Sequence, residues 1–163
     1  MKKKIVQLGN EILRKKAKEV AVSKIKSKEI QDLLKEMIEV LKGEEIGVGL
    51  AASQVGIDKQ IFILKDPKKN NYSVFINPKI IKLSREGRLM SEGCLSVRDY
   101  WGKVKRAAKV LVVSFDGKGD KFEKNFSGLA AQIFQHEVDH LNGVLFVDKA
   151  KELEKSPNNL KSK

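Results

Sequence analysis

The chain contains two histidines, and both fall in the five-residue sequence His136-Glu137-Val138-Asp139-His140. On an α-helix, residues four apart lie one turn apart on the same face, so these two imidazoles can bind one metal ion. Glu137 lies between them, where it can exchange protons with water at such a site without being a ligand. The motif therefore predicts a helix that carries a metal centre.

The helix that carries this motif is predicted to span residues 128–142. Ser127 can cap its start, and Gly143 is a good stop signal at its end. Apolar residues occur nearly all the way around it, which is typical of a helix that is buried on most sides. We expect strands to wrap around this helix, and a rigid element of that kind can hold a metal site accurately.

The remaining elements indicate one mixed domain over residues 1–150, followed by a polar, frayed tail at 151–163. Ser27 can cap a first helix with apolar residues at helical spacing that ends near Gly43. Strands are predicted at 61–64, 72–76, 110–115 and 122–126, with Asn77-Pro78 as a turn or a strand edge. The glycine-rich stretch 116–119 predicts a hairpin between the last two strands.

The only cysteine, Cys94, lies in the glycine-containing segment Glu92-Gly93-Cys94-Leu95-Ser96. A catalytic metal site typically has three protein ligands and one open position, and Cys94 could be the third ligand. Two other interpretations stay open: a lone cysteine is often a small buried hydrophobic residue, and short histidine motifs recur by chance. Because both histidines of the chain fall inside the motif, the pattern favours an enzyme.

A third segment, residues 47–56, combines three glycines with small apolar residues and Gln54. It is not a phosphate-binding loop, because no Gly-Lys-Ser/Thr follows and the glycine spacing is wrong for a dinucleotide site. Small residues allow the backbone to pass close to a ligand, and the Gln54 amide could donate to a developing oxyanion. The alternative is a glycine-rich turn that leads into a short buried element.

The net charge of the 163-residue chain is +12, and lysines spread along the sequence account for most of it. Arginine, the usual reader of bases and phosphates, is scarce, and no nucleic-acid motif stands out, so we expect no specific DNA partner. A solvated lysine-rich surface is favoured, and a weak attraction to a polyanion such as the ribosome stays open. A single cysteine and the lack of a long apolar run indicate the cytosol and no membrane partner.

Taken together, the segments 47–54, 92–96 and 135–140 resemble, in order and in approximate spacing, the three signatures of the peptide deformylases. The resemblance implies removal of the formyl group from N-formylmethionyl nascent peptides, in the bacterial cytoplasm or in an organelle after loss of a transit peptide. It implies one divalent metal ion, Fe(II) first, with Zn(II), Ni(II) or Co(II) as substitutes. The implied fold class is α+β, with antiparallel β-sheets wrapped around the motif-bearing helix.

The resemblance also implies a role for each matching residue. The metal ligands are Cys94, His136 and His140, and Glu137 is the general acid and base. Gln54 and the backbone N–H of Leu95 hold the oxyanion.

For the substrate, the resemblance implies that the peptide lies as an added strand between Val48-Gly49 and Gly93. The methionine pocket would draw on Met90, Leu129 and Ile133, of which the last two could also be plain core residues. Glu92 would pair with Arg106 and brace the cysteine loop.

Two departures from the family pattern concern the substrate and the tail rather than the chemistry. The stretch 97–102 lacks a proline that many relatives carry, and Trp101 stands where some have a basic residue. The C-terminal segment is short, whereas many bacterial members continue in a long helix. Side-chain preference beyond formylmethionine is therefore open.

Two other functions are weighed against the deformylase. A zinc-dependent endopeptidase of the H-E-x-x-H type would need a further ligand downstream, where only Glu152 and Glu154 are available. A basic ribosome- or RNA-binding protein with a structural metal would need a fourth Cys or His ligand, which the sequence lacks.

Overall fold

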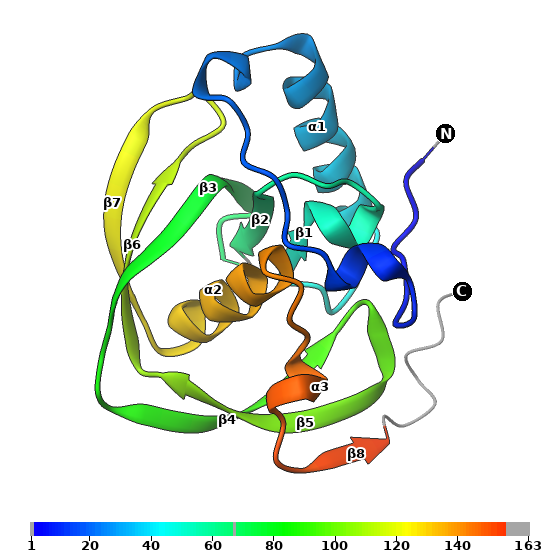
Figure 1. Ribbon diagram of the computed structural model, residues 1–163, viewed down its shortest axis with the longest axis vertical. Helices are drawn as coiled ribbons and strands as arrows, with labels where there is room; N and C mark the ends of the chain where they lie inside the picture. Colours follow the sequence, from blue (N-terminus) through cyan, green and yellow to red (C-terminus); the bar gives the residue numbers. More distant parts are fainter. Residues whose placement is uncertain (1, 67, 156–163) are drawn as a thin grey trace.

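Two antiparallel sheets form the framework of the computed structural model, which describes residues 2–66 and 68–155 (Figure 1). The strand order is β1-β2-β3-β6-β7 in the large sheet and β4-β5-β8 in the small one. The strands are β1 (Gly49–Ala51), β2 (Ile61–Asp66), β3 (Asn71–Leu83), β4 (Gly87–Cys94), β5 (Val97–Ala107), β6 (Lys109–Phe115), β7 (Lys121–Ser127) and β8 (Leu153–Lys155). The helices are α1 (Lys28–Lys42), α2 (Gly128–Leu141) and α3 (Phe146–Lys149), with short 3-10 turns at Glu11–Arg14, Val22–Lys24 and Ala52–Val55.

Helix α2 lies between the two sheets and contacts strands of both, as Figure 1 shows. Its Phe134 packs edge-on against Phe62 of β2 and Phe75 of β3, with ring centroids 5.0 and 5.2 Å apart. The predicted fold class, antiparallel sheets around the motif-bearing helix, is confirmed. Leu129 at the start of α2 is 63% exposed, so the prediction of burial on most sides does not hold for the first turn.

Helix α1 covers the opposite face of the large sheet. Ser27 caps it as predicted, because its Oγ accepts a hydrogen bond from the backbone N–H of Ile30 at 3.4 Å. Its buried apolar face packs against Ile61 and Ile63 of β2, whereas Phe62 between them faces α2. This alternation is what a strand covered on both faces requires.

Strand β3 is longer than predicted and runs through Asn77-Pro78, so the expected turn or strand edge at that point is wrong. The strand lies inside the sheet and tolerates the proline because the register with β6 shifts between Ile76 and Lys79. The side chain of Asn77 supports the irregular backbone, since it accepts from Val20 N–H and donates to Val20 C=O. The predicted hairpin is confirmed as the antiparallel pair β6–β7.

Three details differ from the sequence-based expectations. Strands β4 and β5 were not predicted, although they carry part of the site. Ser127 occupies the N-cap position of α2, but its side chain makes no capping hydrogen bond. Within the expected tail, β8 pairs with β5, and residues 156–163 lie outside the described residues. In the described ranges, no helix combines the length and apolar character that crossing a bilayer would need.

Candidate metal centre and active site

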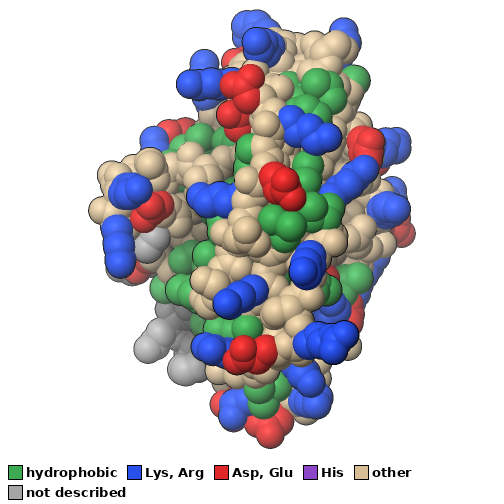
Figure 2. Space-filling view, turned by 90° about the vertical axis from the view of Figure 1, so that its left-hand side faces the viewer, with side chains coloured by type: hydrophobic (Ala, Val, Ile, Leu, Met, Phe, Trp, Pro, Cys, Tyr) green, Lys and Arg blue, Asp and Glu red, His purple; other side chains and the backbone are tan. Residues whose placement is uncertain are grey.

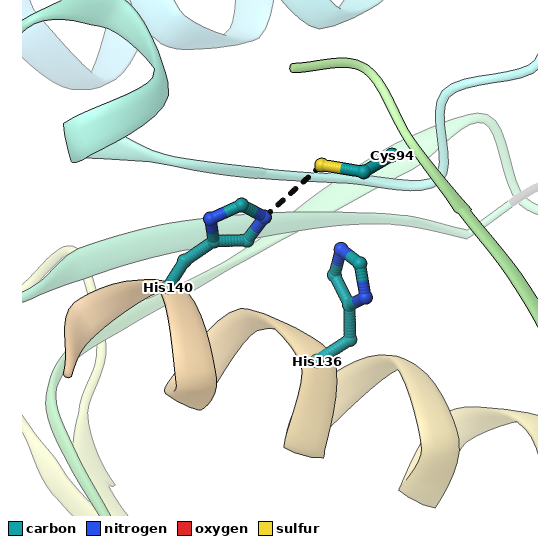
Figure 3. A group of neighbouring side chains, drawn as sticks. All are labelled: Cys94, His136 and His140. Atoms are coloured by element: carbon teal, nitrogen blue, oxygen red, sulfur yellow. Dashed lines mark hydrogen bonds between the residues drawn. The ribbon is translucent and has the colours of Figure 1, made fainter. Parts of the chain in front are cut away.

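Three potential metal ligands converge between α2 and the end of β4 (Figure 3). His136 and His140 lie one turn apart on α2, with ring centroids 4.9 Å apart. The Cys94 Sγ lies 3.2 Å from the Nε2 of His140, and the ligand atoms of all three residues lie within 4.8 Å of one another. Ligands bound tetrahedrally to one ion at about 2.0–2.3 Å are roughly 3.5 Å apart, so the arrangement fits a single metal.

A tight hairpin holds Cys94 in this position. Strands β4 and β5 are joined by the turn Leu95–Ser96, with Cys94 and Val97 as the pair that flanks it. The backbone N–H of Ser96 donates to the Cys94 Sγ at 3.4 Å, and the Nε2 of Gln54 lies 3.5 Å from the same sulfur. These two donors and the tight turn fix the position of the sulfur beside the histidines.

Glu92 orients the first histidine. The Nδ1 of His136 lies 2.8 Å from the Glu92 carboxylate, which leaves the Nε2 of His136 for a metal. Arg106 donates to both oxygens of Glu92, at 2.7 and 2.8 Å, so the predicted pairing is present. Burial opposes ionisation of Glu92, but hydrogen bonds from Arg106 and His136 outweigh it and lower its pKa from 4.5 to about 2. Glu92 therefore stays a carboxylate at neutral pH.

Sequence reasoning missed Asp139, which extends this network. Arg106 donates to Asp139 at 2.6 Å, and Asp139 also pairs with Lys149 of α3 at 3.1 Å. The signal was available, because Asp139 lies within the histidine motif, three residues from His136. The network connects the side chain of His136 to the protein surface.

The two histidines differ in their ionisation. Burial lowers the pKa of His140 well below its usual value, so the imidazole is neutral, as metal binding requires. Burial acts in the same direction on His136, but hydrogen bonds to Cys94 and Glu92 outweigh it and raise its pKa. Metal binding displaces such protons, because only the neutral imidazole is a ligand.

Glu137 is buried beside the three ligands, and burial raises its pKa to about 7. Its Oε2 has no hydrogen-bond partner among the described residues, and neither does the Nδ1 of His140. A Cβ atom on Gly49 would lie 2.5 Å from the Oε1 of Glu137, so any larger residue there would displace that carboxylate. A buried carboxylate oxygen without a partner needs a ligand or water, and this observation supports a metal site of the expected kind.

A cavity of about 220 Å³ opens next to these residues. One wall is the segment 46–49, the other comes from β4 and β5, and the first three turns of α2 close it. It brings together most of the predicted site residues, namely Val48, Gly49, Gln54, Glu92, Gly93, Cys94, Leu95, Leu129, Ile133, His136 and Glu137. Gln54 is fixed at both ends of its amide, since it accepts from Ala51 N–H and donates to Ser96 Oγ.

Among the residues predicted to bind substrate, Met90 is the exception, because it does not line the cavity. It lies on β4 opposite Val104, two residues before Glu92. At about 3.3 Å per residue, the two positions are roughly 7 Å apart along the strand. The contribution of Met90 to a methionine pocket therefore stays a prediction.

Gln132 contributes to the cavity in a way that sequence reasoning missed. It is buried on α2, four residues before His136, and its Nε2 donates to Ser91 C=O at 3.0 Å and approaches Glu92 at 3.4 Å. The helical spacing from His136 could have identified it. Arg98 and Tyr100 of β5 also line the cavity and were not predicted.

The geometry bears on the two alternative functions. The third residue next to the histidines is Cys94, whereas Glu154 lies on β8 opposite Trp101 and is not part of the cluster. Within residues 2–66 and 68–155, no fourth ligand joins the three. The cluster thus has the open form of a catalytic site rather than the closed form of a structural one.

Comparisons with known proteins agree with this geometry. The model of the family described as polypeptide deformylase matches residues 2–156. A peptide deformylase from Desulforudis audaxviator is 40% identical over 146 residues, which cover 90% of this chain and 92% of that protein. The chloroplastic/mitochondrial peptide deformylase 1A of Arabidopsis thaliana is 38% identical over 89% of this chain and 60% of that protein.

Solved structures give the same result. The chain is similar to a Met-Ala-Ser-bound class I type b peptide deformylase from Acinetobacter baumannii, with a TM-score of 0.84 and 37% identity over 91% of this chain and 98% of that one. It is also similar to the peptide deformylase of Thermotoga maritima, with a TM-score of 0.85 and 35% identity over 93% of this chain and 99% of that one.

Proposed function

The chain belongs to the polypeptide deformylase family, and from this premise we propose how its residues remove the formyl group from an N-formylmethionyl peptide. The resemblance recognised in the three sequence motifs is confirmed by the family match and by the relatives. The protein is therefore a metal-dependent hydrolase that acts on the N-formyl group of newly synthesised polypeptides.

Cys94, His136 and His140 are proposed as the ligands of one divalent metal ion. The observation that carries this proposal is the convergence of their ligand atoms within 4.8 Å, next to the unpartnered Oε2 of Glu137. When bound, the metal ion supplies Lewis-acid chemistry, because it lowers the pKa of water and polarises the formyl carbonyl. Fe(II) is the proposed native ion, with Zn(II), Ni(II) or Co(II) able to replace it, since availability rather than affinity decides metal choice.

Glu137 is proposed as the proton carrier of the reaction. With a pKa raised to about 7, it can take a proton from the attacking water and return it to the departing amine nitrogen at neutral pH. As water adds to the formyl carbon, negative charge grows on the carbonyl oxygen. The Nε2 of Gln54 and the N–H of Leu95 are proposed to donate to that oxygen, and each such donor is typically worth about 3 kcal/mol. Breaking the C–N bond releases formate and a free N-terminus.

The substrate peptide is proposed to bind as a strand across the cavity. β1 is an edge strand of the large sheet and β4 is an edge strand of the small one. A peptide between Val48-Gly49 and Gly93 would pair with both edges through backbone hydrogen bonds, which do not depend on its sequence. Leu129 and Ile133 offer apolar surface for the methionine side chain. The Met-Ala-Ser-bound relative from Acinetobacter baumannii supports a peptide as the ligand.

Formate release from formyl-Met-Ala-Ser by protein loaded anaerobically with Fe(II) tests this proposal. We expect turnover that stops when a chelator removes the metal and returns when Fe(II), Ni(II) or Co(II) is added. Metal analysis of the same samples should give one ion per chain. Formate release that continues without metal, or metal-loaded protein that releases none, would contradict the proposal.

The surroundings of the enzyme are proposed from its charge and its relatives. Figure 2, which views the side where Figure 1 shows β7, displays lysines and arginines spread singly among fewer acids. Together with the net charge of +12, this supports weak electrostatic attraction to the ribosome surface. Co-sedimentation with ribosomes should then decrease steeply as salt is raised. Bacterial relatives and one chloroplastic/mitochondrial relative support a bacterial cytoplasmic or an organellar location.

A further inference from the structure

An ion pair beside the cavity is unusually well shielded from solvent. Arg98 donates from both terminal nitrogens to the two carboxylate oxygens of Glu44, at 3.3 and 3.1 Å. Their side chains are 21% and 22% exposed. Among the ion pairs of the described residues, only this one and those of the Glu92 network have both partners less than one quarter exposed. Exposed pairs contribute little, so a shielded bidentate pair calls for a specific explanation.

The pair joins the two walls of the cavity. Glu44 lies in the segment that leads from α1 to β1, and Arg98 is the second residue of β5 and itself lines the cavity. β1 belongs to the large sheet and β5 to the small one, and none of the described strands pairs across the two sheets. Close to the ion pair the walls also touch, since a Cβ on Gly47 would lie 3.0 Å from the side chain of Leu95.

We propose that Arg98 and Glu44 are positioning residues that hold the two walls of the peptide slot at a fixed separation. This inference rests on the proposed function, in which a substrate strand lies between Val48-Gly49 and Gly93. A strand paired on both sides needs edges on the order of 10 Å apart, because neighbouring strands are about 4.8 Å apart. A wall that had to be ordered at each binding event would weaken binding, whereas a wall already held in place removes that cost.

A positioning role predicts a split between the kinetic constants. Without the ion pair, the KM for formyl-Met-Ala-Ser rises about tenfold, because its backbone must bridge two walls that are no longer held together. The kcat stays within about twofold, because the ligands and Glu137 are unchanged. Formyl-methioninamide is too short to pair along both edges, so its KM changes little.

The experiment compares Arg98→Gln, Glu44→Gln, their combination, and the exchanged pair Arg98→Glu with Glu44→Arg. Arg14→Gln is the matched control, because Arg14 pairs with Asp148 at 2.6 Å but is half exposed and does not line the cavity. Both single variants should raise the tripeptide KM, the combination should be no worse than either single change, and the exchanged pair should regain part of the loss. Arg14→Gln should behave as wild type, and metal content should be equal throughout.

Arg98→Lys keeps the charge but loses the bidentate geometry, so its KM should lie between those of wild type and Arg98→Gln. This variant replaces Arg98→Gln in the experiment if the glutamine variant does not fold. An unchanged tripeptide KM in the folded variants would overturn the inference. A simultaneous loss of kcat and of bound metal would also overturn it. The same holds if the KM for formyl-methioninamide rises as much as the KM for the tripeptide. If wild type itself releases no formate, it is the proposed function that fails, whereas an active wild type with unaffected variants refutes only the role of this pair.

Discussion

At the scale of single residues, Glu137 combines deep burial with an unpartnered carboxylate oxygen. It is 3% exposed, its Oε2 has no hydrogen-bond partner among the described residues, and its pKa is raised to about 7. A purely structural carboxylate would be expected to have its acceptors satisfied. Its position next to Cys94 and the two histidines therefore fits a proton carrier rather than a fourth ligand.

Glu137→Gln tests this role. The change keeps the size and removes the titratable group, so we expect full metal content and a fall in turnover of at least roughly 100-fold. Formate release and metal analysis on the same preparation measure both. If the metal-loaded variant were nearly as active as wild type, the role given to Glu137 would be wrong.

Gly49→Ala tests how closely the backbone must approach that carboxylate. The added methyl group would meet the Oε1 of Glu137 at 2.5 Å and the side chain of Leu64 at 3.0 Å, so Glu137 must move. A displacement of about 1 Å at a reacting group can lower the rate roughly 100-fold, which is the loss we expect in kcat/KM. Gly43→Ala is the control, because its nearest neighbour lies at 3.4 Å and its φ is −76°, and it should stay within about twofold of wild type. Equal activity of the two variants would refute the tight contact.

At the scale of elements, an ion pair connects the short helix α3 to the N-terminal segment of the domain. Asp148 accepts a hydrogen bond from the backbone N–H of Leu145 and pairs with Arg14 at 2.6 Å. Burial alone would raise the pKa of Asp148, but the hydrogen bonds from Arg14 and Leu145 lower it below 3.8. The ionised form is therefore favoured by folding.

Asp148→Asn should consequently destabilise the protein in a pH-dependent way. A depressed folded-state pKa contributes stability that is present above the unfolded pKa of about 4 and is lost as pH falls below it. Wild type should be more stable than the variant by less than about 1 kcal/mol near pH 7, because the pair is partly exposed. Denaturant unfolding of both proteins at pH 7 and pH 3 measures the difference. A gap that stays the same or widens at pH 3 would contradict this account.

The sequence pattern predicted elements where one face is apolar and missed those where it is not. Helix α1 and the β6–β7 hairpin follow regular spacing and are confirmed. Strands β4 and β5 were missed because charged side chains, Glu92 and Arg106, occupy inward positions, where they satisfy each other only in the folded state. β8 was missed for a related reason, since its exposed residues are ordered by pairing with β5, which is distant in sequence.

At the scale of the whole molecule, two sheets and one helix assemble the site from three distant segments. The three motifs were sufficient to predict those segments and their meeting point, because metal ligation and oxyanion binding require particular residue types. The sequence could not predict contacts made only by the tertiary arrangement. Which part of β4 faces the cavity depends on that arrangement, and the Arg98–Glu44 pair joins positions 54 residues apart.

The metal content of Cys94→Ala shows whether Cys94 completes a three-ligand metal site. Two imidazoles bind a divalent ion far more weakly than two imidazoles with a thiolate, so the purified variant should retain less than about one tenth of the wild-type metal at micromolar protein concentration. A core cysteine without a ligand role would cost some stability and leave the metal in place. Circular dichroism should show that the variant is folded. We expect a folded protein that has lost its metal, and a folded Cys94→Ala with one metal ion per chain would show that Cys94 is not a ligand.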